Sequence, residues 1–394
     1  MRKQGWVDRY RFLITPQPYL DELLSSWLTR TAFSHGYSLT PFVSRFLKYD
    51  GSSLTRTDID FQDTHELFEK LTHKSRLTYT QIFQMSLQSE GGYLFESEHG
   101  LYPPKQIRKL IDKRAHYGLM FCPKCLAEDT IPYWRKHWRY YFYNACPKHK
   151  VFLADRCGVC SERIRFSKMT LSDAIVYCGK CGRDLRKTIT QKVPKLYEDG
   201  LCAITYFEQG LKNGSFSINN IPAHSLSVFH VHTILSYLLN RQKNLFLEGF
   251  SMLEPYRSLC QHEQNYHSKK ATSIYKSFYL NAMVFYLMED FSSRLKSFSE
   301  ENHLTHRDFL HGFKKAPFWY KKAIDTYVPF QDTVGRQISE SEVIGAMNYL
   351  KSTGQTINQK NVSNIVGCHT TVHKEFVSLY KKLTYKSYHL RDSK

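Results

Sequence analysis

The sequence of 394 residues has no apolar run of the roughly 18 residues that a membrane-spanning helix requires. Its first ten residues include basic side chains but no apolar core, so we expect no secretory signal peptide. The GxxxxGKS/T phosphate loop is also missing, and we therefore expect that the chain does not hydrolyse ATP itself. Together these absences predict a cytoplasmic protein without a membrane partner.

Acidic residues are scarce relative to basic ones. The chain has 36 Asp and Glu against 55 Lys and Arg, which gives a formal net charge of +19 and a pI near 9.4. A protein this basic favours polyanionic partners, because neutralised phosphates release their condensed counterions. Aromatic and basic residues interleave in residues 133–141 and 318–322. An aromatic core with a rim of lysines would give the same stretches, but the net charge of the whole chain favours DNA or a DNA-bound complex.

The few acidic residues argue against a nuclease or transposase, which would need clustered carboxylates for two Mg²⁺ ions. The nearest approach to such a cluster is Asp58, Asp60, Asp63 and Glu66. We interpret these side chains as the polar side of a loop and helix. The sequence therefore predicts a protein that is not an enzyme.

Against these absences stand four Cys/His pairs in residues 122–181, each with two intervening residues. This spacing lets one tight turn offer two ligands to a single tetrahedral metal ion. Taken in order, two pairs close one site. The predicted sites are a Cys₃His site of Cys122, Cys125, Cys146 and His149 and a Cys₄ site of Cys157, Cys160, Cys178 and Cys181. Four protein ligands leave no position for water, so we predict two structural Zn²⁺ ions per chain.

The residues between the ligands are typical of turns. Pro123 and Pro147 preset a turn dihedral, and Gly158, Gly179 and Gly182 tolerate positive φ. An interleaved assignment of the ligands stays open. A disulfide framework is the other alternative, but such frameworks are typical of short secreted chains, and the remaining cysteines are scattered singly.

Most of the remaining sequence predicts helices around this centre. Apolar residues at helical spacing predict helices over 19–34, 40–48, 201–211, 230–247, 274–295 and 340–350. In the first of these, Asp21 and Glu22 are expected in the first turn, where the helix dipole favours negative charge. Residues 219–222 are expected to form a loop. Trp134 and Trp138 are expected to pack over the zinc centre.

The predicted fold is mainly α, with two small zinc-ribbon or zinc-finger modules in the centre and helix-turn-helix elements. Four domains are expected. They are an N-terminal helical domain of helix-turn-helix type (1–115), a double zinc-binding module (116–190), a helical domain (191–335) and a C-terminal helix-turn-helix (336–394).

The C-terminal segment has the layout of a DNA-reading helix pair. Val362, Ile365 and Val366 are expected to face inward on a short helix, Gly367 permits a tight turn, and a second helix follows from about His369. The outward residues of that second helix and its basic end are candidates for contacts to base edges or phosphates. These candidates are His369, Thr370, Thr371, His373, Lys374, Lys381 and Lys382. Two packed helices without a DNA role would give the same pattern.

Two of these motifs together resemble the TniQ/TnsD family of transposon target-selection proteins. The zinc-region motif consists of Cys122-Pro123-Lys124-Cys125, Tyr133-Trp134, Trp138 and Cys146-Pro147-Lys148-His149. The N-terminal signature consists of Pro16, Pro18, Asp21, Glu22, Leu24, Ser26, Trp27, Leu28, Arg30 and Ala32. The resemblance covers residues 12–182, and the second set of cysteines is similar to an additional zinc ribbon of short members, including those of CRISPR-associated transposons.

The resemblance implies a role rather than a catalytic activity. Members of the family mark an insertion site and recruit an AAA+ ATPase of the TnsC or TniB type, which brings the transposase. Long members read DNA directly, whereas short ones dock on an RNA-guided Cascade-type complex, often as a dimer. The resemblance therefore implies a bacterial adaptor acting at the nucleoid, and it leaves open how the target is chosen and whether the chain dimerises. The alternative from the residues alone is a zinc-containing helix-turn-helix transcription regulator that binds operator DNA without an AAA+ partner.

Overall fold

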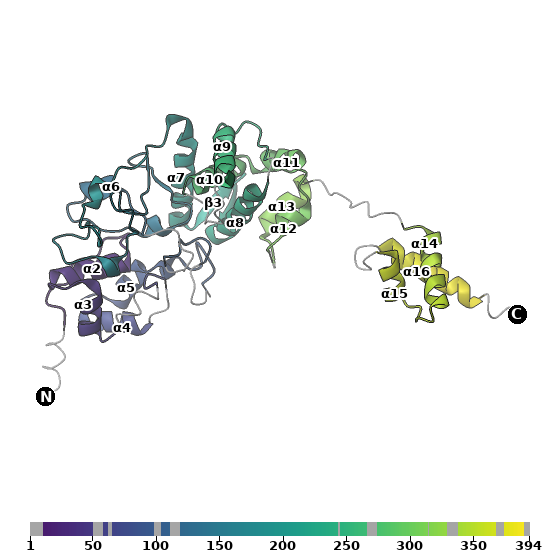
Figure 1. The fold of residues 1–394 in the computed structure, drawn as a ribbon, viewed down its shortest axis with the longest axis horizontal. Helices are drawn as coiled ribbons and strands as arrows, with labels where there is room; N and C mark the ends of the chain where they lie inside the picture. The colour runs from purple at the N-terminus through teal and green to yellow at the C-terminus, as the bar shows by residue number, and fades with distance from the viewer. Residues whose placement is uncertain are drawn as a thin grey trace. The chain divides into compact units, whose positions relative to one another are not determined.

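The computed structural model describes residues 11–49, 58–61, 65–97, 104–110, 119–242, 245–265, 274–313, 315–328, 338–367 and 374–389. The chain divides into two compact units, residues 1–329 and residues 330–394, and each has a hydrophobic core of its own (Figure 1). The described residues are mainly helical and include two short antiparallel hairpins, which confirms the predicted fold class. Among them, no helix combines the length and the apolar character that crossing a membrane requires.

The described residues from 11 to 97 contain four α-helices. They are α2 (Leu24–Ser34), α3 (Leu39–Leu47), α4 (His65–Lys74) and α5 (Tyr79–Met85). Helix α2 buries Leu24, Trp27 and Leu28 completely, as its apolar spacing predicts. Helix α5 begins with a capping box in which Thr78 and Gln81 satisfy each other's backbone N–H groups.

The predicted start of the first helix at residue 19 is wrong. Helix α2 begins at Leu24, so Asp21 and Glu22 lie outside its first turn. The reason is a pairing with a distant segment, in which Leu23 N donates to Trp134 O (2.9 Å) and Lys136 N donates to Asp21 O (2.7 Å). These backbone bonds hold residues 21–23 extended, which a helix would not allow.

The interpretation of the acidic cluster as a polar surface is also wrong for two of its members. Asp58 and Asp60 are buried beside the guanidinium of Arg139, which is 1% exposed. Arg139 Nη2 lies 2.5 Å from Asp58 Oδ2, and Nη1 lies 3.2 Å from Asp60 Oδ2. Asp60 also accepts hydrogen bonds from the backbone N–H (2.8 Å) and the hydroxyl (2.7 Å) of Ser25 in α2. Glu66 is exposed on α4, and Asp63 lies outside the described residues.

The centre of the first unit is irregular. It contains α6 (Pro123–Glu128) and a hairpin of β1 (Ala145–Cys146) with β2 (Val151–Phe152). Short 3-10 helices connect these and neighbouring segments: Leu87–Glu90, Lys136–Arg139, Phe166–Lys168, Leu185–Lys187 and Lys195–Tyr197. Trp134 and Trp138 are fully buried, in agreement with their predicted packing role.

The rest of the first unit is helical apart from one hairpin. Its elements are α7 (Glu198–Asn213), β3 (Ser215–Ile218), β4 (Ile221–His224), α8 (Ser225–Arg241), α9 (Leu253–Asn265), α10 (Ile274–Glu289), α11 (Phe291–Glu301), α12 (His306–Leu310) and α13 (Phe318–Tyr327). The predicted helix over 274–295 is two helices, because the chain turns at Asp290 (φ −133°, ψ 72°). Of the predicted loop 219–222, only Asn219 and Asn220 form the turn of the β3–β4 hairpin, because residues 221 and 222 belong to β4. There Asn219 (φ 49°) and Asn220 (φ 63°) both adopt the left-handed conformation that a two-residue hairpin turn requires.

The second unit has three helices, α14 (Glu340–Ser352), α15 (Gln359–Val366) and α16 (Lys374–His389). Val343, Leu350, Val362 and Phe376 are among the residues that form its buried core. Gly367 ends α15 at φ 73°, as predicted from the Gly turn. The inward position predicted for Ile365 is wrong, because its side chain is 43% exposed. The four predicted domain boundaries stay predictions, and one continuous cluster of buried residues extends from Phe12 to Val328.

Replacement of Arg139 tests whether its ion pairs hold the N-terminal helices to the centre. We predict that Arg139→Met destabilises the protein by about 3–5 kcal/mol at pH 7, because two buried carboxylates lose their counter-charge. The measurement is urea unfolding, with Arg183→Met at an exposed position as the control, for which we expect a change within about 0.5 kcal/mol.

This loss should depend on pH. Burial raises the pKa of Asp60 to about 6, although Arg139 acts in the opposite direction. A raised carboxyl pKa means that folded protein binds this proton more tightly than unfolded protein does. This proton binding stabilises the fold at low pH, and the stabilisation disappears as the pH rises through 6. The deficit of Arg139→Met should therefore be largest above pH 6 and shrink as the pH falls towards 5. An equal deficit at pH 5 and pH 7 would contradict the role assigned to Asp60.

Candidate metal centres

The first Cys/His set converges on one point of the structure, between α6 and the β1–β2 hairpin. Its four ligand atoms lie within 4.8 Å of one another. His149 Nδ1 is 3.4 Å from Cys122 Sγ, 3.3 Å from Cys125 Sγ and 3.4 Å from Cys146 Sγ. Cys125 Sγ and Cys146 Sγ are 3.7 Å apart. The structure thus brings together the four residues that the sequence predicted.

These distances fit a tetrahedral metal ion. Bonds of about 2.3 Å to sulfur and about 2.0 Å to nitrogen would place tetrahedral ligands about 3.8 Å (S···S) and about 3.5 Å (S···N) apart. The observed separations of 3.3–3.7 Å are close to these values. Either cluster can therefore hold one metal ion with all of its ligands drawn from the chain.

The local fold explains how each pair presents two ligands. In all four pairs the carbonyl of the first ligand accepts a hydrogen bond from the N–H four residues later, at 2.8–3.2 Å. In three pairs that later residue has left-handed φ: Lys150 (51°), Ser161 (55°) and Gly182 (68°). In the fourth pair Pro123 begins α6 instead, directly after Cys122.

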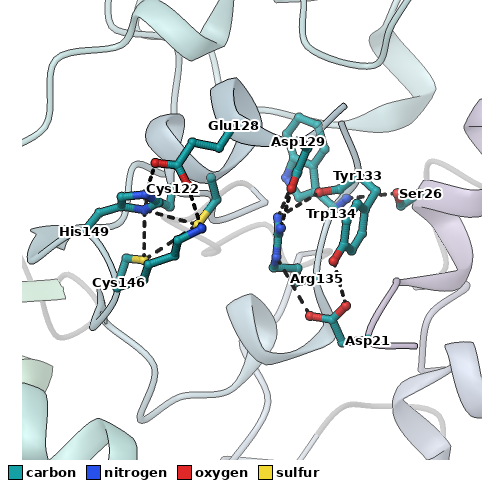
Figure 2. A network of polar contacts seen from close by, with 12 residues as sticks. Asp21, Ser26, Cys122, Glu128, Asp129, Tyr133, Trp134, Arg135, Cys146 and His149 are labelled. Atoms are coloured by element: carbon teal, nitrogen blue, oxygen red, sulfur yellow. Dashed lines mark hydrogen bonds and ion pairs between the residues drawn. The ribbon is translucent and has the colours of Figure 1, made fainter. Parts of the chain in front are cut away.

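His149 is oriented by a carboxylate that the sequence did not reveal. Its Nε2 lies 2.7 Å from Glu128 Oε1 at the end of α6 (Figure 2), while Lys148 Nζ lies 2.6 Å from Glu128 Oε2. Hydrogen bonds from Lys148 and His149 lower the pKa of Glu128, so this carboxylate is ionised at neutral pH. An anion at Nε2 fixes the tautomer that leaves Nδ1 free to bind a metal.

The first cluster is tied to α2 through Arg135. Its guanidinium lies 2.7 Å from Asp129, the residue that follows α6, and 3.8 Å from Asp21 (Figure 2). Beside it, Trp134 N donates to Ser26 Oγ of α2 at 3.0 Å. The metal cluster, the segment around Arg135 and the N-terminal helices therefore form one connected structure.

The second Cys/His set also converges, and it is more exposed. Cys157 Sγ is 3.6 Å from Cys181 Sγ, Cys160 Sγ is 3.6 Å from Cys178 Sγ, and all four sulfurs lie within 4.8 Å of one another. Cys157 and Cys178 are buried, whereas Cys160 is half-buried and Cys181 is exposed. The ligand atoms group in sequence order within each set, not in the interleaved way.

The three glycines of the second cluster, all of which tolerate positive φ, differ in what the fold requires of them. Only Gly182 has positive φ; Gly158 and Gly179 do not. Gly179 is needed for close approach instead, because a Cβ at this position would lie 2.1 Å from the carbonyl oxygen of Lys168. At Gly158 a Cβ would lie 3.1 Å from Cγ2 of Thr188, the movable end of a side chain.

Without a cation the thiols compete for protons. Hydrogen bonds from Cys125 and Cys146 lower the pKa of Cys122, and the hydrogen bond to Cys122 raises the pKa of Cys146 to about 11. Burial raises the pKa of Cys178 to about 12. Most of these thiols would thus stay protonated at neutral pH, and a bound metal ion would displace their protons.

Most of the residues predicted to contact DNA lie outside the part of the chain that the structure describes. His369, Thr370, Thr371 and His373 lie outside the described residues, and Lys374 is the first residue of α16. Lys381 and Lys382 are exposed on α16. The assignment of these residues to DNA stays a prediction.

The two glycines give a matched test of the second cluster. We predict that Gly179→Ala lowers the metal content by about one equivalent per chain. Its Cβ would collide with the carbonyl oxygen of Lys168, and this oxygen can move only if the backbone moves with it. Gly158→Ala should retain the metal, because the Thr188 methyl can move. The measurement is elemental analysis of the purified variants, and equal metal contents would contradict the close-approach role of Gly179.

Comparison with known proteins places part of the chain in a known family model. The family model TniQ matches residues 13–153 of this chain, and no curated protein matches it. The matched segment includes α2 to α6, the β1–β2 hairpin and all four residues of the first cluster, and it ends before the second cluster. The resemblance expected from the Cys/His and N-terminal motifs is therefore confirmed over residues 13–153, which match the TniQ model.

Proposed function

We propose that this chain is a non-catalytic target-selection adaptor of a transposition system. The TniQ match over residues 13–153 carries the proposal, because a TniQ domain implies a transposition-associated role in target selection. In this role the chain binds target DNA, or a DNA-bound RNA-guided complex of the Cascade type. It then recruits an AAA+ ATPase of the TnsC or TniB kind and, through it, the transposase.

The second unit supports the DNA part of the proposal. Its described helices pack on one small core, and Gly367 ends α15 in the left-handed conformation. Helix α16 has Lys381 and Lys382 exposed on its surface. A helix that follows such a turn is the element that enters the major groove in helix-turn-helix proteins. His369, Thr370, Thr371, His373 and Lys374 remain our candidates for contacts to base edges or phosphates.

The buried carboxylates support the non-catalytic part. A two-metal nuclease holds its ions with carboxylates that face an open site. Asp58 and Asp60 instead bind Arg139 in the interior of the first unit. Two carboxylates of the acidic cluster, Asp58 and Asp60, are therefore ion-paired in the interior and do not face an open site.

We further propose that both clusters hold zinc in a structural role. Cys₃His and Cys₄ ligand sets are those of structural zinc sites, and the ligand separations fit its bond lengths. Because all four ligands come from the chain, the ion would contribute to folding without activating water.

The DNA test compares fragments flanking the insertion site of the element with random genomic DNA at near-physiological salt. A preference of about 10³ or more for the flanking fragments would mean that the chain reads its target directly. Weak, salt-sensitive binding without preference would mean that a guide complex chooses the target. Tight binding to an operator, together with no association with an AAA+ ATPase, would favour the transcription-regulator alternative.

We predict that Lys381→Gln with Lys382→Gln weakens DNA binding and reduces the slope of log affinity against log salt by up to about 1.8, since each phosphate contact contributes about 0.9. Lys109→Gln with Lys296→Gln removes the same charge from exposed positions of the first unit and should leave the slope unchanged. Equal effects of the two double variants would remove α16 from the DNA interface.

For the metal, we predict about two zinc ions per chain by elemental analysis. Cys146→Ser should unfold the region around the first cluster, because structural zinc contributes on the order of 10 kcal/mol in small metal domains. Cys202→Ser, at an exposed cysteine outside both clusters, should keep both ions. A content of one ion or none in the unaltered protein would contradict the assignment.

A further inference from the structure

Positive charge is concentrated in the segment around the second cluster, which we call the second module (residues 155–195, all of them described). It has ten Lys and Arg against four Asp and Glu, a net charge of +6 in 41 residues. The TniQ-matching residues 13–153 have 18 against 14, a net charge of +4 in 141 residues. The second module therefore has several times the charge density of the domain beside it.

Most carboxylates of the second module are already neutralised locally. Asp155 pairs with Arg156 at 2.7 Å, Glu162 with Lys168 at 2.7 Å, and Asp184 with Arg186 at 2.9 Å. Arg165, Arg183, Lys187 and Lys192 are exposed and form no salt bridge within the part of the chain that the structure describes. These four cations, which we call the free cations, therefore face solvent outside any such salt bridge, although the charge of Lys187 also acts on the Asp184 carboxyl.

The backbone of the second module holds the free cations in defined places. Arg183 accepts a backbone hydrogen bond from Cys178 at 2.9 Å, so it lies against the second pair of ligands. Lys187 ends the 3-10 helix Leu185–Lys187, which packs against α6, and Lys192 bridges to Val151 of β2. Arg165 precedes the 3-10 helix Phe166–Lys168, whose end meets Gly179. The positive charges are thus fixed on a folded surface.

The composition of this surface separates two kinds of partner. Protein interfaces are enriched in aromatic residues and depleted of lysine at their centres. The second module has two aromatic residues, Phe166 and Tyr177, and neither is exposed. Exposed aliphatic side chains, such as Val159 and Ile189, occur singly. Cations without an apolar anchor suit phosphates, of which duplex DNA presents one about every 1.7 Å of its axis.

We infer that the second module is a sequence-independent binding surface for the phosphate backbone of duplex DNA, formed by Arg165, Arg183, Lys187 and Lys192. It lies in a different unit from the terminal helices, so the chain contacts DNA with both of its units. This inference deepens the proposed function and rests on its DNA partner. A metal ion in the second cluster would hold the phosphate-binding surface in shape. Base recognition would belong to other elements of the chain.

The test uses the full-length protein, a fluorescent random-sequence duplex and salt from 50 to 200 mM. The variant Arg165→Gln/Arg183→Gln/Lys187→Gln/Lys192→Gln should lower affinity at least tenfold at the lowest salt and reduce the salt slope by up to about 3.6. A retained content of two metal ions and an unchanged circular dichroism spectrum show that the variant folds. If it loses metal, the double variant Lys187→Gln/Lys192→Gln, away from the ligand pairs, should still reduce the slope by up to about 1.8.

The matched control is Lys105→Gln/Lys124→Gln/Lys296→Gln/Lys315→Gln, which removes four exposed positive charges from other parts of the first unit. Its salt slope should stay within experimental error of the unaltered protein. Equal slopes for the two quadruple variants would overturn the inference, because net charge alone would then explain binding. An unchanged slope in the module variant would also overturn it and would assign the surface to an acidic protein partner.

Random-sequence DNA separates this test from that of the proposed function. Loss of preference for insertion-site DNA, or failure to bind the AAA+ ATPase, would count against the adaptor role alone. A normal preference for insertion-site DNA in the module variant, with an unchanged salt slope, would count against the phosphate surface alone.

Discussion

The convergence of four Cys/His ligand atoms within 4.8 Å, achieved twice, is the constraint on which the centre of this protein depends. Thiolates at such distances would repel one another, so a bound metal ion would supply the charge that holds each cluster together. The centre has few other sources of stability, since its described regular structure consists of one short helix, one two-stranded hairpin and single turns of 3-10 helix. Each ligand pair closes its own turn, and each pair of turns fixes the chain between them.

Two arginines, one buried and one half-buried, connect this centre to the N-terminal helices through ion pairs. Arg135 connects Asp129 at the end of α6 with Asp21 beside α2, and Arg139 connects the same segment to Asp58 and Asp60. A buried guanidinium is costly unless it is fully paired, so these contacts specify one arrangement more than they add stability. In the TniQ-matching residues the first set of metal ligands is therefore connected by ion pairs to the N-terminal helices. The second module, whose cluster is more exposed, follows directly in the sequence.

The ligands could be predicted from the sequence because the decisive spacing is local: two residues between members of a pair already define the turn. Helix α3 and the turn at Gly367 were predicted for the same reason. The start of α2 could not be, because Leu23 is held by Trp134, more than 100 residues away. Glu128 and Arg139 were missed because their partners are also distant in sequence. The close approach at Gly179 was not predicted, since only the fold shows Lys168 beside it. At Asn219–Asn220 a loop was predicted but the hairpin was not, although two residues that tolerate left-handed φ favour one.

The adaptor role makes one demand that no DNA-binding property can meet, namely that the chain holds an AAA+ ATPase on the target. The direct measurement immobilises insertion-site DNA, supplies the guide complex where the element encodes one, and quantifies the ATPase retained with and without this protein. The account predicts that retention requires this protein and is lost when Cys146→Ser disrupts the first cluster. Equal retention of the ATPase without the protein, or tight DNA binding by the protein with no ATPase retained, would contradict it.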